Sequence, residues 1–228
     1  MEDAGVFSAV LAGVLLVVGF LWVFSSGSEP APEQLPEHLL FLDFETTGLD
    51  PEKDVILEVG AIAVTRSMVE IGSYGRVLAM SLVPEPAPDC RQDMVQALRT
   101  AARPRVQKMH DRNGLWRDLE AATTSINRAE DYLCEMLDSL HAIDGKKVQL
   151  AGFSVHFDHA FAAMHMPRLA KHPALSHRRM DLSVPRALFR AWAPDAEVLP
   201  AEVAHRALPD CRAAFDALKV VRRELRRL

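Results

Sequence analysis

The sequence is short of cysteine and of positive charge, and each shortage argues against a class of protein. Its three cysteines, Cys90, Cys134 and Cys211, are widely spaced and include no Cys-x-x-Cys pair. This pattern argues against a disulfide framework and against a zinc site. The chain has neither an internal repeat nor a glycine-rich phosphate loop. A net charge of −5 is a poor match for a protein that holds long nucleic acid without sequence preference.

The segment Val6–Phe24 lacks any charged residue over 19 positions. A helix of this length spans roughly 28 Å, close to the thickness of the hydrocarbon core of a bilayer. We therefore expect residues 1–25 to form a transmembrane anchor and residues 26–37, which are rich in proline, to form a linker. Two alternatives stay open. One is a buried helix; the other is a signal peptide cleaved near Ser25–Ser28, although the chain start has no basic residue.

The remaining residues, 38–228, have the size of one globular domain. Three strand-like runs come first, and helical and strand-like segments alternate after them, which predicts an α/β layered fold with a mixed sheet. The expected strands are Leu39–Glu45, Val55–Thr65, Tyr74–Leu82, Val148–Phe153 and Arg179–Leu182, and the expected helices are Asp89–Ala102, Ile126–Leu140, a segment from about Asp158, Val184–Trp192 and Pro209–Arg227.

Two carboxylates lie at the end of the first predicted strand. Alternate side chains of a strand point to the same face, so Asp43 and Glu45 project together. Two neighbouring carboxylates repel each other and are costly to bury unless a cation lies between them. Hard divalent ions such as Mg²⁺ prefer oxygen ligands of this kind. Spacing alone leaves two interpretations open, a solvent-facing acidic pair and a metal site.

Further acids lie at later strand ends and at a helix start. Asp158 follows the fourth predicted strand, Asp181 lies in the fifth, and His205 precedes Asp210 by five residues. Proline is favoured in the first turn of a helix, so Pro209 places Asp210 in the last helix and leaves His205 on the preceding loop, where we expect it to be mobile. On one continuous helix, a five-residue step would turn the two side chains roughly 140° apart.

In order and spacing these patches resemble the DEDDh class of 3′→5′ exonucleases, whose name lists four acids and a histidine. Within that class the sequence is most similar to oligoribonuclease. The similarity covers residues 39–228 and runs through Met109–Leu115, Leu150–Gly152, Met166–Leu169, Arg179–Ser183 and His205–Leu208. The resemblance implies an RNase H-like α/β fold, with a mixed central sheet and flanking helices.

The resemblance also implies a catalytic centre. Asp43, Glu45, Asp158 and Asp210 would hold two divalent ions, Mg²⁺ or Mn²⁺, with Asp43 shared between them. His205 would accept a proton from the attacking water, since histidine titrates near neutral pH.

Residues outside this centre have other expected roles. The resemblance implies that the substrate contacts Thr46, Thr47, Gly48 and His110. Asp181 is expected to cap or orient its surroundings, because the set of four acids is complete without it.

The sequence departs from the family at positions that contact substrate. Arg105-Val106 stands where oligoribonucleases carry a tryptophan that stacks on a base, and His165 replaces the tyrosine of their Tyr-Met-Pro. Stacking commonly contributes ~1–3 kcal/mol per base, so we do not expect a strict preference for dinucleotides. The family's homodimer is a further expectation, but its contacts through that tyrosine are lost here.

The sequence therefore predicts an exonuclease that releases nucleoside 5′-monophosphates from the 3′ ends of short single-stranded RNA by two-metal-ion hydrolysis. One alternative is a 3′→5′ DNA exonuclease of the same class, for trimming or proofreading. The other is a membrane-tethered protein that binds nucleic acid without cleaving it. For a single-pass membrane protein of this kind, the odd number of cysteines and the expected substrate favour a catalytic domain on the cytoplasmic side.

Overall fold

The computed structural model describes residues 35–79, 90–192 and 204–226. The predicted anchor, and the predicted linker up to residue 34, lie outside the described residues, so both stay predictions. Within the described ranges, no helix combines the length and the apolar character that crossing a membrane requires.

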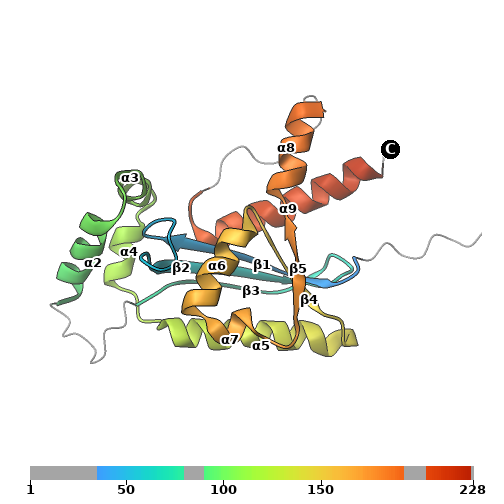
Figure 1. The fold of residues 1–228 in the computed structure, drawn as a ribbon, viewed down its shortest axis with the longest axis horizontal. Helices are drawn as coiled ribbons and strands as arrows, with labels where there is room; N and C mark the ends of the chain where they lie inside the picture. The colour runs from blue at the N-terminus through green and yellow to red at the C-terminus, as the bar shows by residue number, and fades with distance from the viewer. Residues whose placement is uncertain (1–34, 80–89, 193–203, 227–228) are drawn as a thin grey trace, which may run out of the picture. The chain divides into compact units, whose positions relative to one another are not determined.

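A five-stranded sheet in the order β3-β2-β1-β4-β5 forms the centre of the domain (Figure 1). The first three strands form an antiparallel meander, whereas β4 and β5 run parallel to β1. The strands are β1 (His38–Thr46), β2 (Ile56–Val64), β3 (Glu70–Val77), β4 (Val148–Gly152) and β5 (Leu175–Asp181). The predicted mixed sheet is confirmed.

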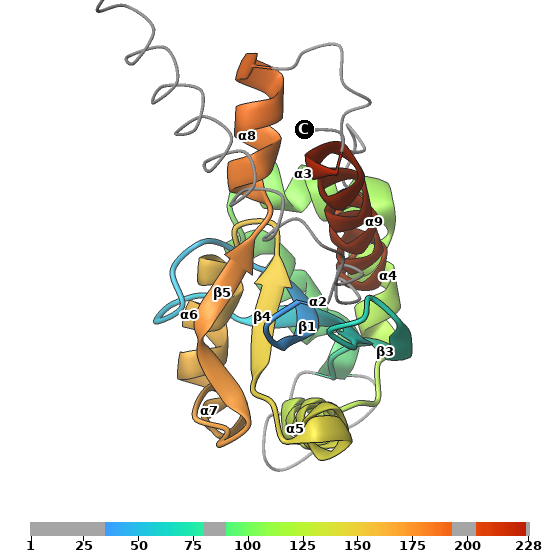
Figure 2. The same ribbon diagram turned by 90° about the vertical axis from the view of Figure 1, so that its right-hand side faces the viewer.

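Helices cover both faces of the sheet, because alternate residues of β1 are apolar on both sides. Leu39 and Phe41 belong to a core that contains residues of α9, whereas Leu40, Leu42 and Phe44 belong to a core that contains residues of α5, α6 and α7. Figures 1 and 2 show α9 and α5 on opposite sides of the sheet. The helices are α2 (Cys90–Ala101), α3 (Pro104–Asn113), α4 (Leu115–Glu120), α5 (Ile126–Asp144), α6 (Val155–His165), α7 (Pro167–Ala170), α8 (Ser183–Trp192) and α9 (Ala207–Leu225).

Helices α3 and α4 and strand β3 differ from the sequence prediction for local reasons. Helices α3 and α4 were not predicted, although Pro104 at the first turn and Gly114 with φ +77° at the end are the usual signals of a helix start and stop. Strand β3 was predicted to begin at Tyr74 but begins at Glu70. Its first four residues lie on the edge strand and contain a single large apolar side chain, the exposed Ile71, so they show no apolar alternation.

Candidate active site

Strand β1 extends past its neighbour β4, and the extension carries the two predicted carboxylates. The pairing of β1 with β4 stops at Phe41 and Ala151, whereas the pairing with β2 continues to Thr46. Phe41 faces α9, so Asp43 and Glu45, two and four residues later, lie on that same face. The strand therefore presents both carboxylates where the sheet is open on one side.

Asp158 reaches the open edge of β1 from the first turn of α6. Its Oδ1 accepts a hydrogen bond of 2.8 Å from the backbone N–H of Phe44. That N–H lies beyond the end of β4, so no strand supplies its partner. The bond satisfies an otherwise unpaired buried donor and holds the carboxylate beside Asp43 and Glu45.

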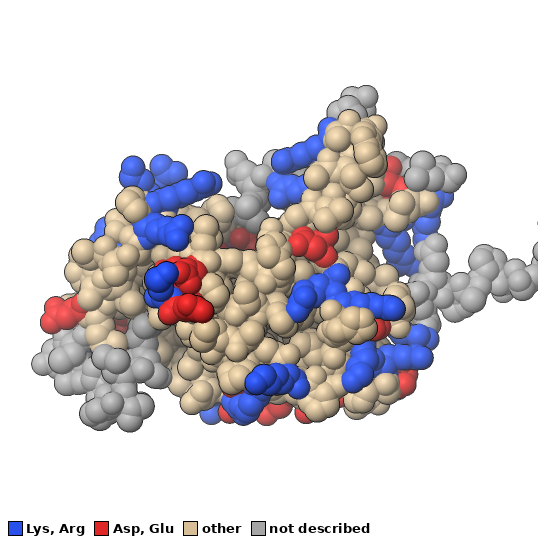
Figure 3. All heavy atoms as spheres, viewed as in Figure 1, with Lys and Arg blue, Asp and Glu red and all other residues tan. Residues whose placement is uncertain are grey.

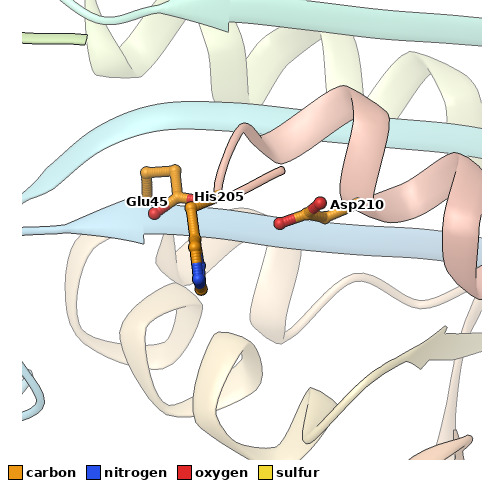
Figure 4. A group of neighbouring side chains, drawn as sticks. All are labelled: Glu45, His205 and Asp210. Carbon is orange, nitrogen blue, oxygen red and sulfur yellow. The ribbon is translucent and has the colours of Figure 1, made fainter. Parts of the chain in front are cut away.

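Asp210 and His205 approach from the start of α9. Ligand atoms of Glu45, His205 and Asp210 all lie within 4.8 Å of one another. Figure 4 shows the Asp210 carboxylate directed from α9 toward the other two side chains. Its Oδ1 accepts a 2.8 Å hydrogen bond from the N–H of Ala204, which ties the preceding loop to the helix.

A glycine on β2, Gly60, allows α9 to begin this close to the sheet because it has no side chain. A Cβ atom on Gly60 would lie 2.2 Å from the carbonyl carbon of Ala207, the first residue of α9. Any larger residue at this position would push the helix away, and Asp210 with it. Gly60 pairs with Asp43 across the two strands, so this close approach occurs at the site itself.

A buried ion pair fixes the loop that carries His205. Glu58 on β2 accepts two hydrogen bonds of 3.0 Å from the Arg206 guanidinium and one of 3.1 Å from the Ala207 N–H. Arg206 also donates to Asp118 of α4 at 2.9 Å. Sequence reasoning missed this clamp. Its signal was Glu58 itself, a lone acid in the apolar strand β2, because a buried charge requires a partner.

The clamp holds His205 in an unusual backbone conformation. Its φ is +51°, in the left-handed region that costs non-glycine residues of order 1–3 kcal/mol. The side-chain amide of Asn113 donates to the His205 carbonyl, and Arg206 follows directly. The sequence predicts a mobile histidine on this loop. The structure instead holds its backbone on both sides and leaves the imidazole exposed.

The clustered acids have raised pKa values because they are buried together. Burial, and then repulsion from Asp210 and Glu58, raises the pKa of Glu45 to about 8. Burial raises the pKa of Asp158 to about 7 and also raises that of Asp210. The pKa of Asp43 lies well above its ordinary value because of burial, with repulsion from Asp158 and Glu45 adding to it.

The donor set fits hard divalent cations. No lysine or arginine of the described residues forms an ion pair with Asp43, Glu45, Asp158 or Asp210, whereas the neighbouring Glu58 has Arg206. Glu45, Asp158 and Asp210 are buried and Asp43 is half-buried; without a cation, carboxylates gathered in this way repel one another, and oxygen ligands are what Mg²⁺ and Mn²⁺ prefer. These carboxylates are therefore the residues that could hold metal.

The predicted substrate residues Thr46, Thr47 and Gly48 form the turn after β1. The Thr47 hydroxyl donates to Asp54 at 2.9 Å and accepts from the Val55 N–H at 3.0 Å, while the Thr46 hydroxyl donates to the Gly48 carbonyl at 2.6 Å. Both hydroxyls thus stabilise the turn. Their contact with a substrate stays a prediction.

His110 lies behind the site. Its ring has 0% exposure and packs edge-on against Trp116. Nε2 donates to the Thr46 carbonyl at 3.4 Å and lies 3.7 Å from a Glu45 oxygen, while Nδ1 accepts from Asn113 at 3.4 Å. Burial lowers the pKa of His110, which agrees with a neutral ring in this arrangement. The residue supports Glu45 from inside, and its predicted contact with substrate phosphate stays a prediction.

Asp181 lies at the end of β5 and binds two helix starts. Its Oδ1 accepts hydrogen bonds of 2.9 Å from the N–H groups of Ser154, which precedes α6, and of Ser183, which opens α8. The structure thus gives Asp181 a capping arrangement that orients the helix carrying Asp158.

Residues 40–218 match the RNase_T family, described as exonuclease. The chain belongs to this exonuclease family. Among its curated relatives, oligoribonuclease of Bordetella pertussis is 32% identical over 188 residues, which cover 82% of this chain and 94% of that protein. Oligoribonuclease of Corynebacterium diphtheriae is 31% identical, covering 82% of each chain. The mouse mitochondrial oligoribonuclease is 30% identical, covering 88% of this chain and 78% of its own.

Solved structures agree with this assignment at the level of the fold. Exonuclease I of E. coli, in complex with a dT13 oligonucleotide, has a TM-score of 0.55 at 18% identity. It is matched over 84% of this chain and 42% of its own, so the present chain spans less than half of that protein. The RNase H-like fold is confirmed. The present chain is thus a 3′→5′ exonuclease, and its family normally uses divalent metal ions.

Proposed function

We propose that this exonuclease shortens RNA oligonucleotides from the 3′ end and releases nucleoside 5′-monophosphates. The observation that carries the proposal is the convergence of Glu45, His205 and Asp210 within 4.8 Å, beside Asp43 and Asp158. The three curated relatives described above are each named oligoribonuclease, which supports RNA as the substrate. DNA oligonucleotides are bound by the exonuclease I structures, which share only the fold, so DNA is the alternative to be tested.

The residues divide into metal ligands and a proton acceptor. Asp43, Glu45, Asp158 and Asp210 would hold two divalent ions, Mg²⁺ or Mn²⁺, with Asp43 shared. Bound ions would activate a water molecule and neutralise charge on the phosphate. The exposed imidazole of His205 accepts the proton of the attacking water. As the water oxygen bonds to phosphorus, the bond to the 3′-oxygen of the preceding nucleotide breaks. That oxygen takes a proton from solvent and becomes the 3′-hydroxyl of a strand shortened by one.

The test uses the full chain in mild detergent with RNAs of increasing length from the dinucleotide upward. Stepwise release of mononucleotides with Mg²⁺ or Mn²⁺, and none with chelator, is the expected result. Internal cuts, or cleavage in chelator, would contradict the proposal. DNA oligonucleotides of the same sequences are assayed in parallel. Faster turnover of DNA than of RNA would show that DNA is the preferred substrate and would contradict the proposal of RNA.

Asp43→Asn is the active-site variant for this test, and Asp216→Asn is its matched control. Asp216 lies on α9 and is exposed, with Lys219 at 2.8 Å, so its replacement changes the same chemical group away from the acids. We expect Asp43→Asn to fold and to lose nuclease activity, and Asp216→Asn to keep it. Activity that survives in Asp43→Asn would point to a contaminating nuclease.

We further propose that residues 1–25 tether the enzyme to a membrane, on the basis of the uncharged run Val6–Phe24. The catalytic domain would then work in the cytoplasm beside that membrane. Flotation of the full chain with lipid vesicles checks this, and a chain found only in the vesicle-free fraction would contradict it.

A further inference from the structure

A basic groove lies beside His205. It has a volume of about 570 Å³ and is lined by Arg105, Lys108, Met109, Arg112 and Asn113 of α3 together with Ala204 and His205. Three of these side chains are cationic and none is acidic. Figure 3 shows lysine and arginine side chains gathered over α3.

The three cations share one face of α3. Arg105, Lys108 and Arg112 are spaced i, i+3 and i+7, which places them on adjacent turns of one side. All three are exposed, and none forms an ion pair with a described residue. Like charges at this spacing repel one another and weaken a helix slightly. The arrangement therefore has no evident structural benefit, and it favours an anionic partner.

The groove is continuous with the catalytic centre, because His205 belongs to both. The acids of the centre repel a phosphate chain, and the protein as a whole is negative, with a net charge of −5. A local run of cations next to these acids supplies the attraction that the rest of the molecule lacks. Phosphates adjacent to the scissile one in the same strand are the anions that must lie within reach.

We propose that this groove binds the backbone of a single-stranded substrate and makes the enzyme favour strands longer than a dinucleotide. The inference rests on the proposed function, because it takes the acids beside His205 as the cleavage site. The lysine and arginine side chains of the groove contact phosphate groups, which RNA and DNA share, so we expect the groove to bind either nucleic acid. The planar guanidinium of Arg105 is also suited to stacking on a base.

The test compares the triple variant Arg105→Gln, Lys108→Gln, Arg112→Gln with a matched triple variant, Arg128→Gln, Lys146→Gln, Lys171→Gln. The control cations are exposed, have no side-chain ion pair among the described residues, and belong to α5 and to the ends of α5 and α7, on the face opposite α9. Both variants of the full chain are assayed on a decanucleotide and on an unphosphorylated dinucleotide, whose one phosphate is the scissile one.

For the groove variant we expect kcat/KM on the decanucleotide to fall about tenfold, as for the loss of three exposed charge contacts. The dependence of log(kcat/KM) on log salt should also flatten by about 0.7 for each phosphate contact removed. Turnover of the dinucleotide should stay within about twofold of the unmodified enzyme, and the control triple should change neither value. Equal losses on both substrates, or no loss on the decanucleotide, would overturn the proposal.

Binding separates this inference from the proposed function. Fluorescence anisotropy of a labelled decanucleotide is measured in chelator, where no cleavage is expected. If the unmodified chain binds the decanucleotide but cleaves nothing, and the groove variant binds it more weakly, the groove inference stands and the proposed function fails. If cleavage is normal and binding is unaffected by the three substitutions, the groove inference fails alone.

Discussion

Replacing Arg206 by methionine tests how the fold positions His205, the proposed proton acceptor. Methionine keeps an unbranched side chain but removes the guanidinium that holds Glu58 with two hydrogen bonds of 3.0 Å and Asp118 with one of 2.9 Å. The Glu58 side chain is only 8% exposed, so its charge is left in a poorly hydrated place. The substitution therefore affects both folding and the position of His205.

The expected loss of stability follows from these contacts. Removing one partner of a buried ion pair usually costs about 3–5 kcal/mol. Arg206 is partly exposed, and Glu58 keeps its bond from the Ala207 N–H, so we expect about 2–3 kcal/mol. Catalysis should suffer as well, because a displacement near 1 Å of a reacting group costs about 10²-fold.

Arg212→Met is the matched control on the same helix. Arg212 pairs with Glu70 through two hydrogen bonds of 3.0 and 3.1 Å, but this pair is exposed and lies away from the acids. Its loss should cost less than about 1 kcal/mol and leave kcat unchanged. Arg206→Lys adds a second comparison, since lysine keeps the charge but cannot form the two-pronged bond.

Urea unfolding measures the stability of each variant, and mononucleotide release at saturating RNA measures kcat well below the unfolding temperature. We expect Arg206→Met to lower both, and Arg206→Lys to fall between it and the unmodified enzyme. If Arg206→Met loses stability but keeps kcat within about twofold, the clamp stabilises the fold without positioning His205. If neither the stability nor kcat changes, the ion pair between Arg206 and Glu58 contributes neither to folding nor to the position of His205.

Two further predictions concern the acids. Because the folded protein protonates Glu45 and Asp158 at about pH 8 and 7, far above their ordinary values, it binds more protons than the unfolded chain between about pH 4 and 8. Calorimetry in chelator should therefore show the unfolding temperature falling as pH rises through this range. Saturating Mn²⁺ should abolish this dependence of the unfolding temperature on pH. A metal-free protein that is more stable at pH 8 than at pH 5 would contradict the prediction. Asp181→Ala removes the acceptor for the N–H groups of Ser154 and Ser183 and should cost about 1–2 kcal/mol in urea unfolding, with Mn²⁺ affinity by titration calorimetry unchanged. A large loss of affinity would contradict a purely capping role and show that Asp181 acts on the metal site, either as a ligand or through the position of α6.

Local patterns predicted the strands and the placement of the first acids. The alternation in β1 places Asp43 and Glu45 on one face, and the structure has this arrangement because strand geometry depends only on neighbouring residues. The loop position of His205 and the helical position of Asp210 follow in the same way from Pro209. The helix starts at Ala207, two residues earlier than predicted, since Arg206 and Glu58 together support its first turn.

Other features could not be read from local patterns. Helix α3 has a short and weakly apolar pattern, so the signals at Pro104 and Gly114 were the only guide to its bounds. Its position then buries His110 completely and turns Arg105 toward the groove. Sequence spacing specifies which side of a helix a residue occupies, but not which side of the helix the sheet covers.

The sequence by itself determined the chemistry: which carboxylates and which histidine are available, and on which face of a strand or near which helix start each one lies. Only the tertiary structure decided that Glu58 and Arg206, 148 positions apart, pair to hold His205, and that His110 supports the site from inside. Periodicity is a property of neighbouring residues, whereas burial and ion pairing depend on contacts between distant segments that form only when the chain packs.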